Sequence, residues 1–576
     1  MKIKLRGATV TDETRAEHNQ QTRMPILIGF FVVMAVLLWL FTHVGTFFGI
    51  PSPEDVFGTF AEIVDYDFDS DGNVDSQLRV QSTDFWPDND SGRAWLFGAI
   101  CGAFLSGYFR PLRYKRPSYV FWFLAAFDLL YGWHLTTMFL TGHLFLYLLL
   151  HGPHRKNTEL LSTAFGMLAT LLTWVETTEL KYLLLYMSAG GATSWAAFNY
   201  VLNPVLTSQH QAAKLIPAIA MHLPFLAIYG GIYYELASGV KWDKSLAVII
   251  FMYQWARLIT YHMDYRDGEV PKDLPLLHYL SVFLSPAVIP NYRYAPYLAQ
   301  GYTYLESSFY NNDKNSIITG GLKLWSIAIF YLIFGEYIVD CFKHYMVSQW
   351  NVPVYKFISS MVEDYCDGTP MSTPTVLLST ICDQYRIFLL WGAVTHFKVG
   401  TWRVLGYNVD PQYNKPWLAT NLANLWSRFA FHYREFLVRA VYYPVFFRVF
   451  RNNTSLRIFT AIMVATIIGN PFWGHTPAKL IYNGITFERF FRLILRSWPY
   501  YILLGLGISL CHLYLMRKVR TRKPWTRDRW FVVDILCSYL TIQYFSLIHV
   551  FIRPQSNSNL WDHVKLFLIG LGIHLD

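Results

Sequence analysis

Long apolar blocks separated by short polar stretches run through almost the whole of this 576-residue chain. The first block, residues 24–50, contains no Asp, Glu, Lys or Arg. A membrane-spanning helix needs about 20 consecutive apolar residues, so this block predicts a first transmembrane helix. Similar blocks lie at approximate residues 94–109, 119–150, 159–175, 181–206, 213–237, 245–262, 317–342, 375–397, 454–473, 496–516 and 528–552. They predict an all-α, polytopic membrane protein with about 11–14 transmembrane helices.

Two segments depart from this pattern in different ways. Residues 275–300 are apolar but contain four prolines. Because proline has no backbone N–H donor, a lipid-exposed helix would not tolerate so many, and we expect a re-entrant or protein-buried element. Residues 402–450 mix many aromatic residues with Arg, Lys, His and Glu. This segment is too polar for a lipid-facing helix, so we expect it to form helices that line a wet cavity inside the bundle.

Composition and charge then set the sidedness. The chain is 53% hydrophobic and 15% charged, whereas soluble proteins average about 25% charged residues, so a disordered chain is excluded and an ordinary soluble enzyme is disfavoured. The basic segment 1–23 places the N-terminus in the cytoplasm. Residues 51–93 carry eleven Asp or Glu against two Arg and are expected to form an acidic extracytoplasmic loop, followed by one multi-helix membrane domain over 94–576. Lys and Arg at the ends of the spans account for the net charge of +9, so no nucleic-acid partner is expected.

The acidic loop contains a pattern typical of calcium loops, D-x-D-x-D-G-x-x-D. Its candidate ligands are Asp67, Asp69, Asp71, Asn73 and Asp75. Carboxylates at alternate positions, followed by a glycine at a sharp turn, can wrap oxygen ligands around Ca²⁺. The twelfth position is Leu78 and not the usual Glu, so the alternative is a solvated acidic turn that repels anionic glycans or lipids.

The densest group of polar residues in apolar surroundings lies between residues 391 and 475. Polar groups at membrane depth are costly and indicate function by default. The candidate lining residues are His396, Arg403, Asn424, Trp426, Arg428, His432 and Trp473. His475 stands in an otherwise apolar stretch and is the candidate general base, because histidine is the side chain best suited to move a proton near neutral pH. The alternative for His475 is a structural hydrogen bond to a backbone carbonyl.

Four segments, in order, make residues 245–480 resemble the membrane-bound O-acyltransferases of the alginate O-acetylation and D-alanyl-teichoic-acid transfer branch. The segment from Gln254 to Arg266 is similar to the branch pattern F-R-x-I-S-Y-x-x-D-x-Y-R. Residues 279–286, followed by Arg293 and Tyr294, resemble a second pattern. The segment from Gly400 to Trp426, GTWRVLGYNVDPQYNKPWLATNLANLW, resembles G-x-A-R-L-F-G-F-x-x-P-x-N-F-x-x-P-Y-x-A-x-S-I-x-x-F-W. Finally, residues 472–475, FWGH, are similar to the L-W-H-G that carries the family's catalytic histidine.

The resemblance implies a ring of tilted helices around a central tunnel, with His475 as the base toward an acceptor hydroxyl. The donor would be a cytoplasmic acyl-CoA or acyl-carrier thioester, with no tightly bound cofactor, and the acceptor a secreted or cell-envelope glycan. His432 would assist, although the family's second histidine aligns with Ala430, so His432 can substitute only across an irregular turn. A structural pairing of His432 with Glu435 is the alternative, and Arg403 and Arg428 are tunnel residues or members of buried ion pairs.

The family also implies a setting. We expect an integral protein of the cytoplasmic membrane of a bacterium, in contact with the lipid bilayer and with an extracytoplasmic, esterase-like or acyltransferase partner. The displaced histidines leave a second reading open, a catalytically inert relative that serves as a scaffold or as an acyl or lipid conduit. An unrelated transporter is disfavoured because no paired inverted halves are visible in the sequence.

Overall fold

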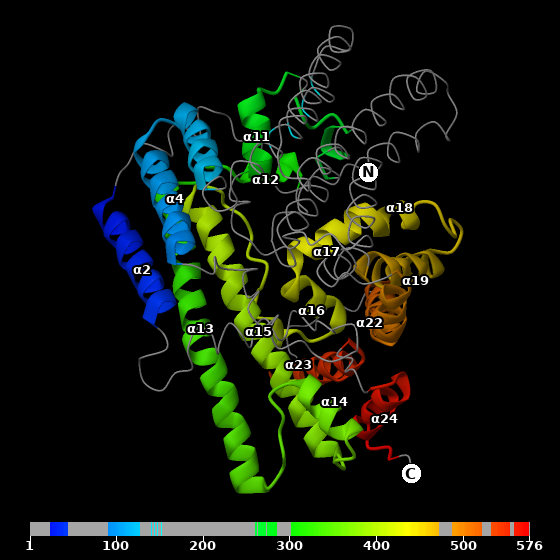
Figure 1. Cartoon of the computed structure of the whole chain (residues 1–576). Helices are drawn as coiled ribbons and strands as arrows, with labels where there is room; N and C mark the ends of the chain where they lie inside the picture. The colour runs from blue at the N-terminus through cyan, green and yellow to red at the C-terminus, as the bar shows by residue number, and fades with distance from the viewer. Residues whose placement is uncertain are drawn as a thin grey trace, which may run out of the picture. The chain divides into compact units, whose positions relative to one another are not determined.

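The structure is a computed structural model (Figure 1). It describes residues 23–43, 90–126, four positions between 140 and 151, most of 260–284, and then 301–471, 487–520, 531–552 and 558–574. All elements in these ranges are helices, apart from one isolated bridge between Phe309 and Tyr407. The expected all-α class is therefore confirmed for this part of the chain.

The chain divides into two compact units. Unit 1 comprises Met1–Asp90, Ile289–Pro477 and Phe487–Asp576, and unit 2 comprises Ser91–Val288 and Ala478–Thr486. In unit 2, helix α4 (Asp90–Phe109) is followed by a helix over 112–126, and α11 (Leu276–Leu284) begins directly after Pro275. Gly102 of α4 lies against the ring of Trp122, where an added Cβ would approach ring carbons to 2.5–2.7 Å. The small residue therefore allows these two helices to pack closely.

Two helices in the described residues are long and apolar enough to cross a membrane. They are Ser497–Met516, within α22 (Phe487–Arg520), and Val532–Ile552, formed by α23 (Phe531–Ile548) and the 3₁₀ turn η9 (His549–Ile552). Shorter apolar helices cover Met24–Leu37, Phe97–Phe109 and Thr454–Gly469. These findings support membrane association, while the number of 11–14 spans and the ring around a tunnel stay predictions.

Large apolar side chains on these helices face outward. On α22, Leu510 is 65% exposed, and on α23 Val532 is 67% and Leu540 56% exposed. Helix α2 (Met24–His43), the predicted first span, likewise exposes Ile28 and Val32. An apolar surface of this kind is unusual for a soluble monomer and is what a lipid-facing helix presents.

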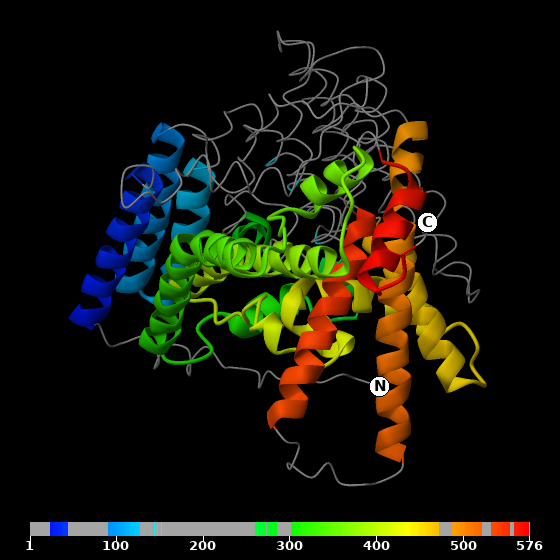
Figure 2. The same ribbon diagram turned by 90° about the horizontal axis from the view of Figure 1, so that it is seen from below.

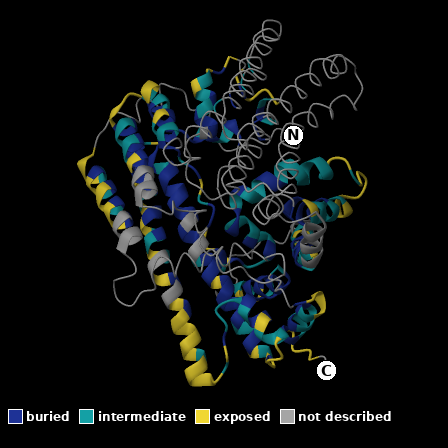
Figure 3. Cartoon of the chain, in the orientation of Figure 1, coloured by how far each residue is buried: buried dark blue, intermediate teal, exposed yellow. Residues whose placement is uncertain are grey.

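The long helices α13 (Lys314–Trp350) and α15 (Thr373–Val404) form the scaffold of unit 1, and α2 packs against α13. Each begins at a capping side chain, since Asp313 accepts a hydrogen bond from the amide of Ser316 and Ser372 accepts one from Thr375. Figure 3 shows that the C-terminal half of α13 is exposed. Its N-terminal half is mostly buried or half-buried, and in the C-terminal half Val339 still packs in a cluster with Val354 and with Cys382 of α15.

Two glycines set the distance between α13 and α15. A Cβ added to Gly321 would lie 2.7 Å from the carbonyl oxygen of Gly400, and one added to Gly400 would lie 2.9 Å from the oxygen of Gly321. Nearby, the indole of Trp325 stacks on Phe397 and donates to its carbonyl oxygen at 3.0 Å. Small residues thus bring the two backbones into contact, as membrane helix pairs often do.

We expect Gly321→Ala to destabilise the protein by about 1–3 kcal/mol, because the new methyl group would have to push the backbone of α15 away. Thermal unfolding of the purified chain in detergent measures this. The matched control is Gly98→Ala on α4, where nothing lies within 4 Å of the new Cβ and alanine is the better helix former. A Gly321→Ala protein as stable as the control would show that the helices are not held at this distance.

Between α15 and α22 the chain forms a series of short, broken helices. These are η6 (Pro416–Leu418), α16 (Leu422–Phe429), α17 (Phe431–Leu437), η7 (Val438–Tyr442), α18 (Tyr443–Phe446), α19 (Thr454–Val464) and η8 (Ala465–Gly469). Both η7 and η8 are π-helical, a form that is rare and often found at functional sites. The predicted helical character of residues 402–450 is confirmed for 416–418 and for most of 422–446, whereas 405–415 form an irregular turn. The cavity they would line stays a prediction.

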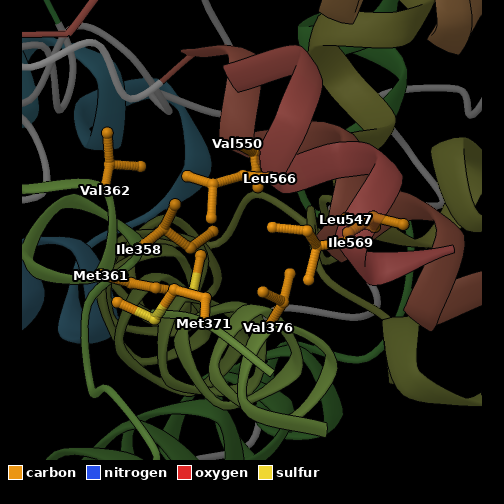
Figure 4. Packing of buried hydrophobic residues seen from close by; sticks show 9 residues of the cluster. All are labelled: Ile358, Met361, Val362, Met371, Val376, Leu547, Val550, Leu566 and Ile569. Atoms are coloured by element: carbon orange, nitrogen blue, oxygen red, sulfur yellow. The ribbon is translucent and has the colours of Figure 1, made fainter. Parts of the chain in front are cut away.

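A hydrophobic cluster closes one end of unit 1, where α14 (Ile358–Cys366) and α24 (Leu560–Gly570) meet α15 and η9 (Figure 4). Its buried members are Ile358, Met361, Val362, Met371, Val376, Leu547, Val550, Leu566 and Ile569. Five elements, α14, α15, α23, η9 and α24, therefore share one apolar core, which fixes the N-terminal end of α15.

Candidate functional site

His432 lies just after a break that follows α16, the helix in which the long sequence motif ends. Helix α16 ends at Phe429, and Ala430 between α16 and α17 has φ −144° and ψ 53°, which is not helical. The family's second histidine aligns with Ala430, and His432 could stand in for it only if the backbone turned irregularly between the two positions. The backbone at Ala430 makes such a turn. The requirement stated from the sequence is thus met by the backbone.

The ring of His432 is completely buried and bound on one side. Its Nε2 lies 2.8 Å from the carbonyl oxygen of Asp410. A carbonyl can only accept, so Nε2 carries the proton, and in the neutral ring Nδ1 carries the lone pair. Glu435, which was the alternative partner of His432, forms an ion pair with Arg434. His432 therefore presents Nδ1 as its basic atom.

Burial also determines the charge of His432. The pKa of its imidazole is lowered to about 3, mainly by removal from water and to a smaller extent by the nearby Arg434 guanidinium, against the opposing effect of the Asp410 hydrogen bond. A base with so low a pKa accepts a proton poorly at neutral pH, because general bases work best when their pKa lies near the working pH. The low pKa of His432 therefore favours an orienting role over proton abstraction.

Acid should destabilise the protein through His432. The unfolded residue binds a proton near pH 6.5 and the folded one only near pH 3, so between these values the unfolded state binds more protons and stability falls as the pH falls, by at most about 1.4 kcal/mol per pH unit. In His432→Gln, which keeps a donor for the Asp410 carbonyl, this contribution should disappear. Thermal unfolding of both proteins between pH 7 and pH 5 measures the difference, and identical pH profiles would contradict it.

Tyr304 and Asp410 hold the turn that binds His432. Tyr304, on α12 (Tyr302–Ser308), accepts a hydrogen bond from the Asp410 amide at 2.9 Å and donates to the Asp410 carboxylate at 3.3 Å. Its ring packs edge-on against His432, with the centroids 5.9 Å apart. Burial raises the pKa of Tyr304, so its hydroxyl stays protonated. The neighbouring Asn408 amide donates to the Ser308 carbonyl at 2.8 Å, which ties the same turn to α12.

Arg403 connects the turn at Asp410 to α15 and lies near a further histidine, His396. Its Nε donates to the carbonyl oxygen of Val409 at 2.8 Å. The guanidinium is close enough to act electrostatically on both Tyr304 and His396. His396 lies seven residues earlier on α15 and therefore on the same face, two turns away. We call His396, Arg403, Tyr304, Asp410 and His432 the polar network.

His396 is the member of the polar network with an unsatisfied buried atom. Its side chain is 7% exposed, and its Nδ1 makes no hydrogen bond within the described residues. Its ring lies 5.8 Å from that of Tyr331, which in turn contacts Trp417. A buried polar atom that lacks a partner is rare and indicates a strained, catalytic or ligand-binding position. His396 is thus the member of the polar network best placed to meet a polar group of a substrate.

Arg428 binds both Asn424 on α16 and Asn414 in the loop that precedes this helix. Arg428 donates from Nε to the side-chain oxygen of Asn424 at 2.9 Å and from a terminal nitrogen to the Asn414 carbonyl at 3.1 Å. The Asn414 amide donates back to the Arg428 carbonyl at 2.8 Å. Within the described residues, Arg403 and Arg428 bind carbonyl and amide oxygens and not carboxylates. Arg428 therefore fastens the loop before α16, while Trp426 is half-buried on that helix.

The apolar block 375–397 contains a buried ion pair, which the average hydropathy of the block does not indicate. Arg386 donates to Asp383 at 3.0 Å, with side-chain exposures of 0% and 3%. The guanidinium also lies over the ring of Phe357, 4.0 Å from its centroid. The i, i+3 spacing of an acidic and a basic residue inside an apolar helix is the sequence signal that would have indicated it. Charged side chains are almost never fully buried unless they are paired, as these two are.

Several predicted site residues lie outside the described part of the chain. These are His475, Trp473 and the possible calcium ligands Asp67, Asp69, Asp71, Asn73 and Asp75. Within the described residues, no group of three or more His, Cys, Asp or Glu side chains could hold a metal ion. The base and the calcium loop therefore stay predictions from the sequence.

No protein-family model matches the chain, and no curated protein matches it. The resemblance to the acyltransferases thus stays a prediction from the motifs quoted above. Two members of the polar network, Arg403 and Asp410, fall within the longest of them, the segment from Gly400 to Trp426, and His432 follows it.

Proposed function

We propose that the chain is a membrane-bound O-acyltransferase that transfers an acyl group, most simply acetyl, from a cytoplasmic thioester toward a hydroxyl of a secreted or cell-envelope glycan. The observation that carries this proposal is the buried polar network around His396 and His432. It is formed by the segment that resembles the acyltransferases, in a helical chain with two candidate spans. A bacterial cytoplasmic membrane with the N-terminus inside and an extracytoplasmic partner belong to the same proposal.

The reaction needs a base, a positioned acceptor and a path for the leaving thiolate. The acceptor hydroxyl oxygen attacks the thioester carbonyl carbon while His475 takes the hydroxyl proton, and the carbon–sulfur bond breaks. The thiolate then receives the proton, so an ester and a free thiol are formed. Arg403, a fixed positive charge next to His396, would stabilise negative charge that develops on the carbonyl oxygen.

The direct test uses membranes from cells that contain or lack the chain. They are incubated with acetyl-CoA labelled in the acetyl group, and label is then released from the polysaccharide fraction by mild alkali, which cleaves esters. We expect alkali-labile label only when the chain is present. If both membranes incorporate the same amount, the chain is not the transferase for acetyl groups.

A second function, an inert scaffold or lipid conduit, is favoured by one observation. His432 is completely buried, and its low pKa makes it a poor base. In that case the polar network would be structural, and transfer would depend on the presence of the chain but not on its histidines. The histidine variants considered below distinguish the two functions.

A further inference from the structure

The turn between α18 and α19 exposes aromatic and basic side chains together. Phe447 is 58% exposed and Phe450 51% exposed, and Arg448 and Arg451 are exposed beside them. Leu456, in the first turn of α19, is a further 39% exposed. We call residues 447–453 the aromatic–arginine turn. Such a surface is costly in water and calls for a partner.

Hydrogen bonds and one cation–π contact hold the backbone of the aromatic–arginine turn in place. Phe450 has φ 45°, in the left-handed region that a bulky residue rarely adopts. The Asn453 amide donates to the Phe450 carbonyl at 2.9 Å, and the Asn453 side chain caps α19 by accepting from Leu456 at 3.0 Å. The guanidinium of Arg457 lies over the Phe446 ring and donates to the Arg451 carbonyl. These contacts hold the backbone that presents Phe450 outward.

The charge of this region has one sign. No Asp or Glu occurs in the sequence between Glu435 and Glu488, whereas Arg439, Arg448, Arg451 and Arg457 all do. A cluster of arginines that is not interspersed with carboxylates attracts an anionic partner, and the planar guanidinium suits phosphate particularly well. The neighbouring phenylalanines require that this partner also offer an apolar environment.

The packing of α19 on α22 indicates how far the aromatic–arginine turn lies from the middle of a candidate membrane span. Helix α19 lies against α22 (Figure 2). Gly505, near the middle of the candidate span Ser497–Met516, faces Met463, whose sulfur would lie 2.9 Å from an added Cβ. From Met463 back to Thr454 the axis of α19 is about 14 Å long at 1.5 Å per residue. Half of a hydrocarbon core is about 15 Å, so α19 is long enough to bring the turn before Thr454 close to the lipid headgroups.

We propose that the aromatic–arginine turn anchors the chain in one membrane leaflet, with Phe447 and Phe450 among the upper acyl chains and Arg448 and Arg451 bound to the phosphate groups of anionic phospholipids. Aromatic side chains at the interface and basic residues over anionic headgroups are the pairing that such a location favours. This inference rests on the membrane location in the proposed function and is independent of acyl transfer.

Photo-crosslinking of the full chain tests it. p-Benzoylphenylalanine replaces Phe450 in one protein and Leu510 in another, and each is reconstituted in vesicles of equal parts phosphatidylglycerol and phosphatidylcholine. After irradiation, mass spectrometry identifies the lipid attached. We expect at least three times more phosphatidylglycerol than phosphatidylcholine at position 450 and equal amounts at position 510. Adding Arg448→Gln and Arg451→Gln to the first protein should bring its ratio to that of position 510.

Each other outcome has a distinct meaning. Lipid adducts at 510 but none at 450 overturn the anchor and leave the membrane location intact. Adducts at neither position overturn both. Equal amounts of the two lipids at 450, or a ratio unchanged by the arginine substitutions, overturn the recognition of anionic headgroups, and an adduct between two copies of the chain would show that the turn is a protein interface.

Discussion

His475→Ala is expected to reduce acyl transfer to the polysaccharide by about 10²–10⁴-fold, the usual contribution of a general base. The protein should still accumulate in the membrane, because a single side chain in this stretch is not expected to carry the fold. The measurement is the acetate that mild alkali releases from envelope polysaccharide of cells that express each variant. The amount of protein and its thermal unfolding are followed in parallel.

A matched histidine makes this result interpretable. His344 lies on the exposed end of α13, and His344→Ala should leave transfer unchanged. For His432→Gln, an orienting residue, we expect a smaller loss of about tenfold, or about 1.4 kcal/mol of transition-state stabilisation. If His475→Ala is as active as His344→Ala, the acyltransferase mechanism fails and the scaffold function stands.

Asp383→Leu is expected to destabilise the protein by about 3–5 kcal/mol, because it removes the carboxylate to which the buried Arg386 guanidinium donates. Replacing both residues, Asp383→Leu with Arg386→Met, should recover most of that loss, since an apolar pair of similar volume has no charge to keep in low dielectric. Unfolding in detergent, followed by heat and by denaturant, measures both variants.

The exposed ion pair of Lys356 with Asp340 provides the comparison, with an N–O distance of 3.2 Å. Its Asp340→Leu variant should lose less than about 1 kcal/mol, as surface pairs contribute little. A loss of that small size for Asp383→Leu would show that water reaches the Asp383–Arg386 pair.

Hydropathy predicted the long helices well, because their apolar residues are continuous along the chain. The block 496–516 corresponds to the candidate span Ser497–Met516, and the block 528–552 to Val532–Ile552. The predicted first span starts at Met24, as α2 does. An average over many residues dilutes two charged positions among their apolar neighbours and does not show that the two charges pair, so the Asp383–Arg386 pair remained hidden.

The candidate site could be predicted in part. The motif from Gly400 to Trp426 indicated the region, and the count of residues to His432 required an irregular turn, which Ala430 provides. Tyr304 could not be found in this way, since it lies 106 residues from Asp410 in sequence and meets it only through folding. The π-helical segments η7 and η8 likewise depend on packing against neighbours and have no local sequence signal.

The close contact of α13 with α15 has a mechanical consequence. A terminal nitrogen of Arg403 approaches Gly320 so closely that an added Cβ would lie 3.0 Å from it, and the same helix exposes Phe330 and Phe334 on its outer side. Arg403 of the polar network therefore packs against α13, the helix whose outer side would face the lipid. Under the proposed function, lateral pressure or a change of bilayer thickness that tilts α13 would move the guanidinium of Arg403 with it, so acyl transfer would respond to the physical state of the membrane.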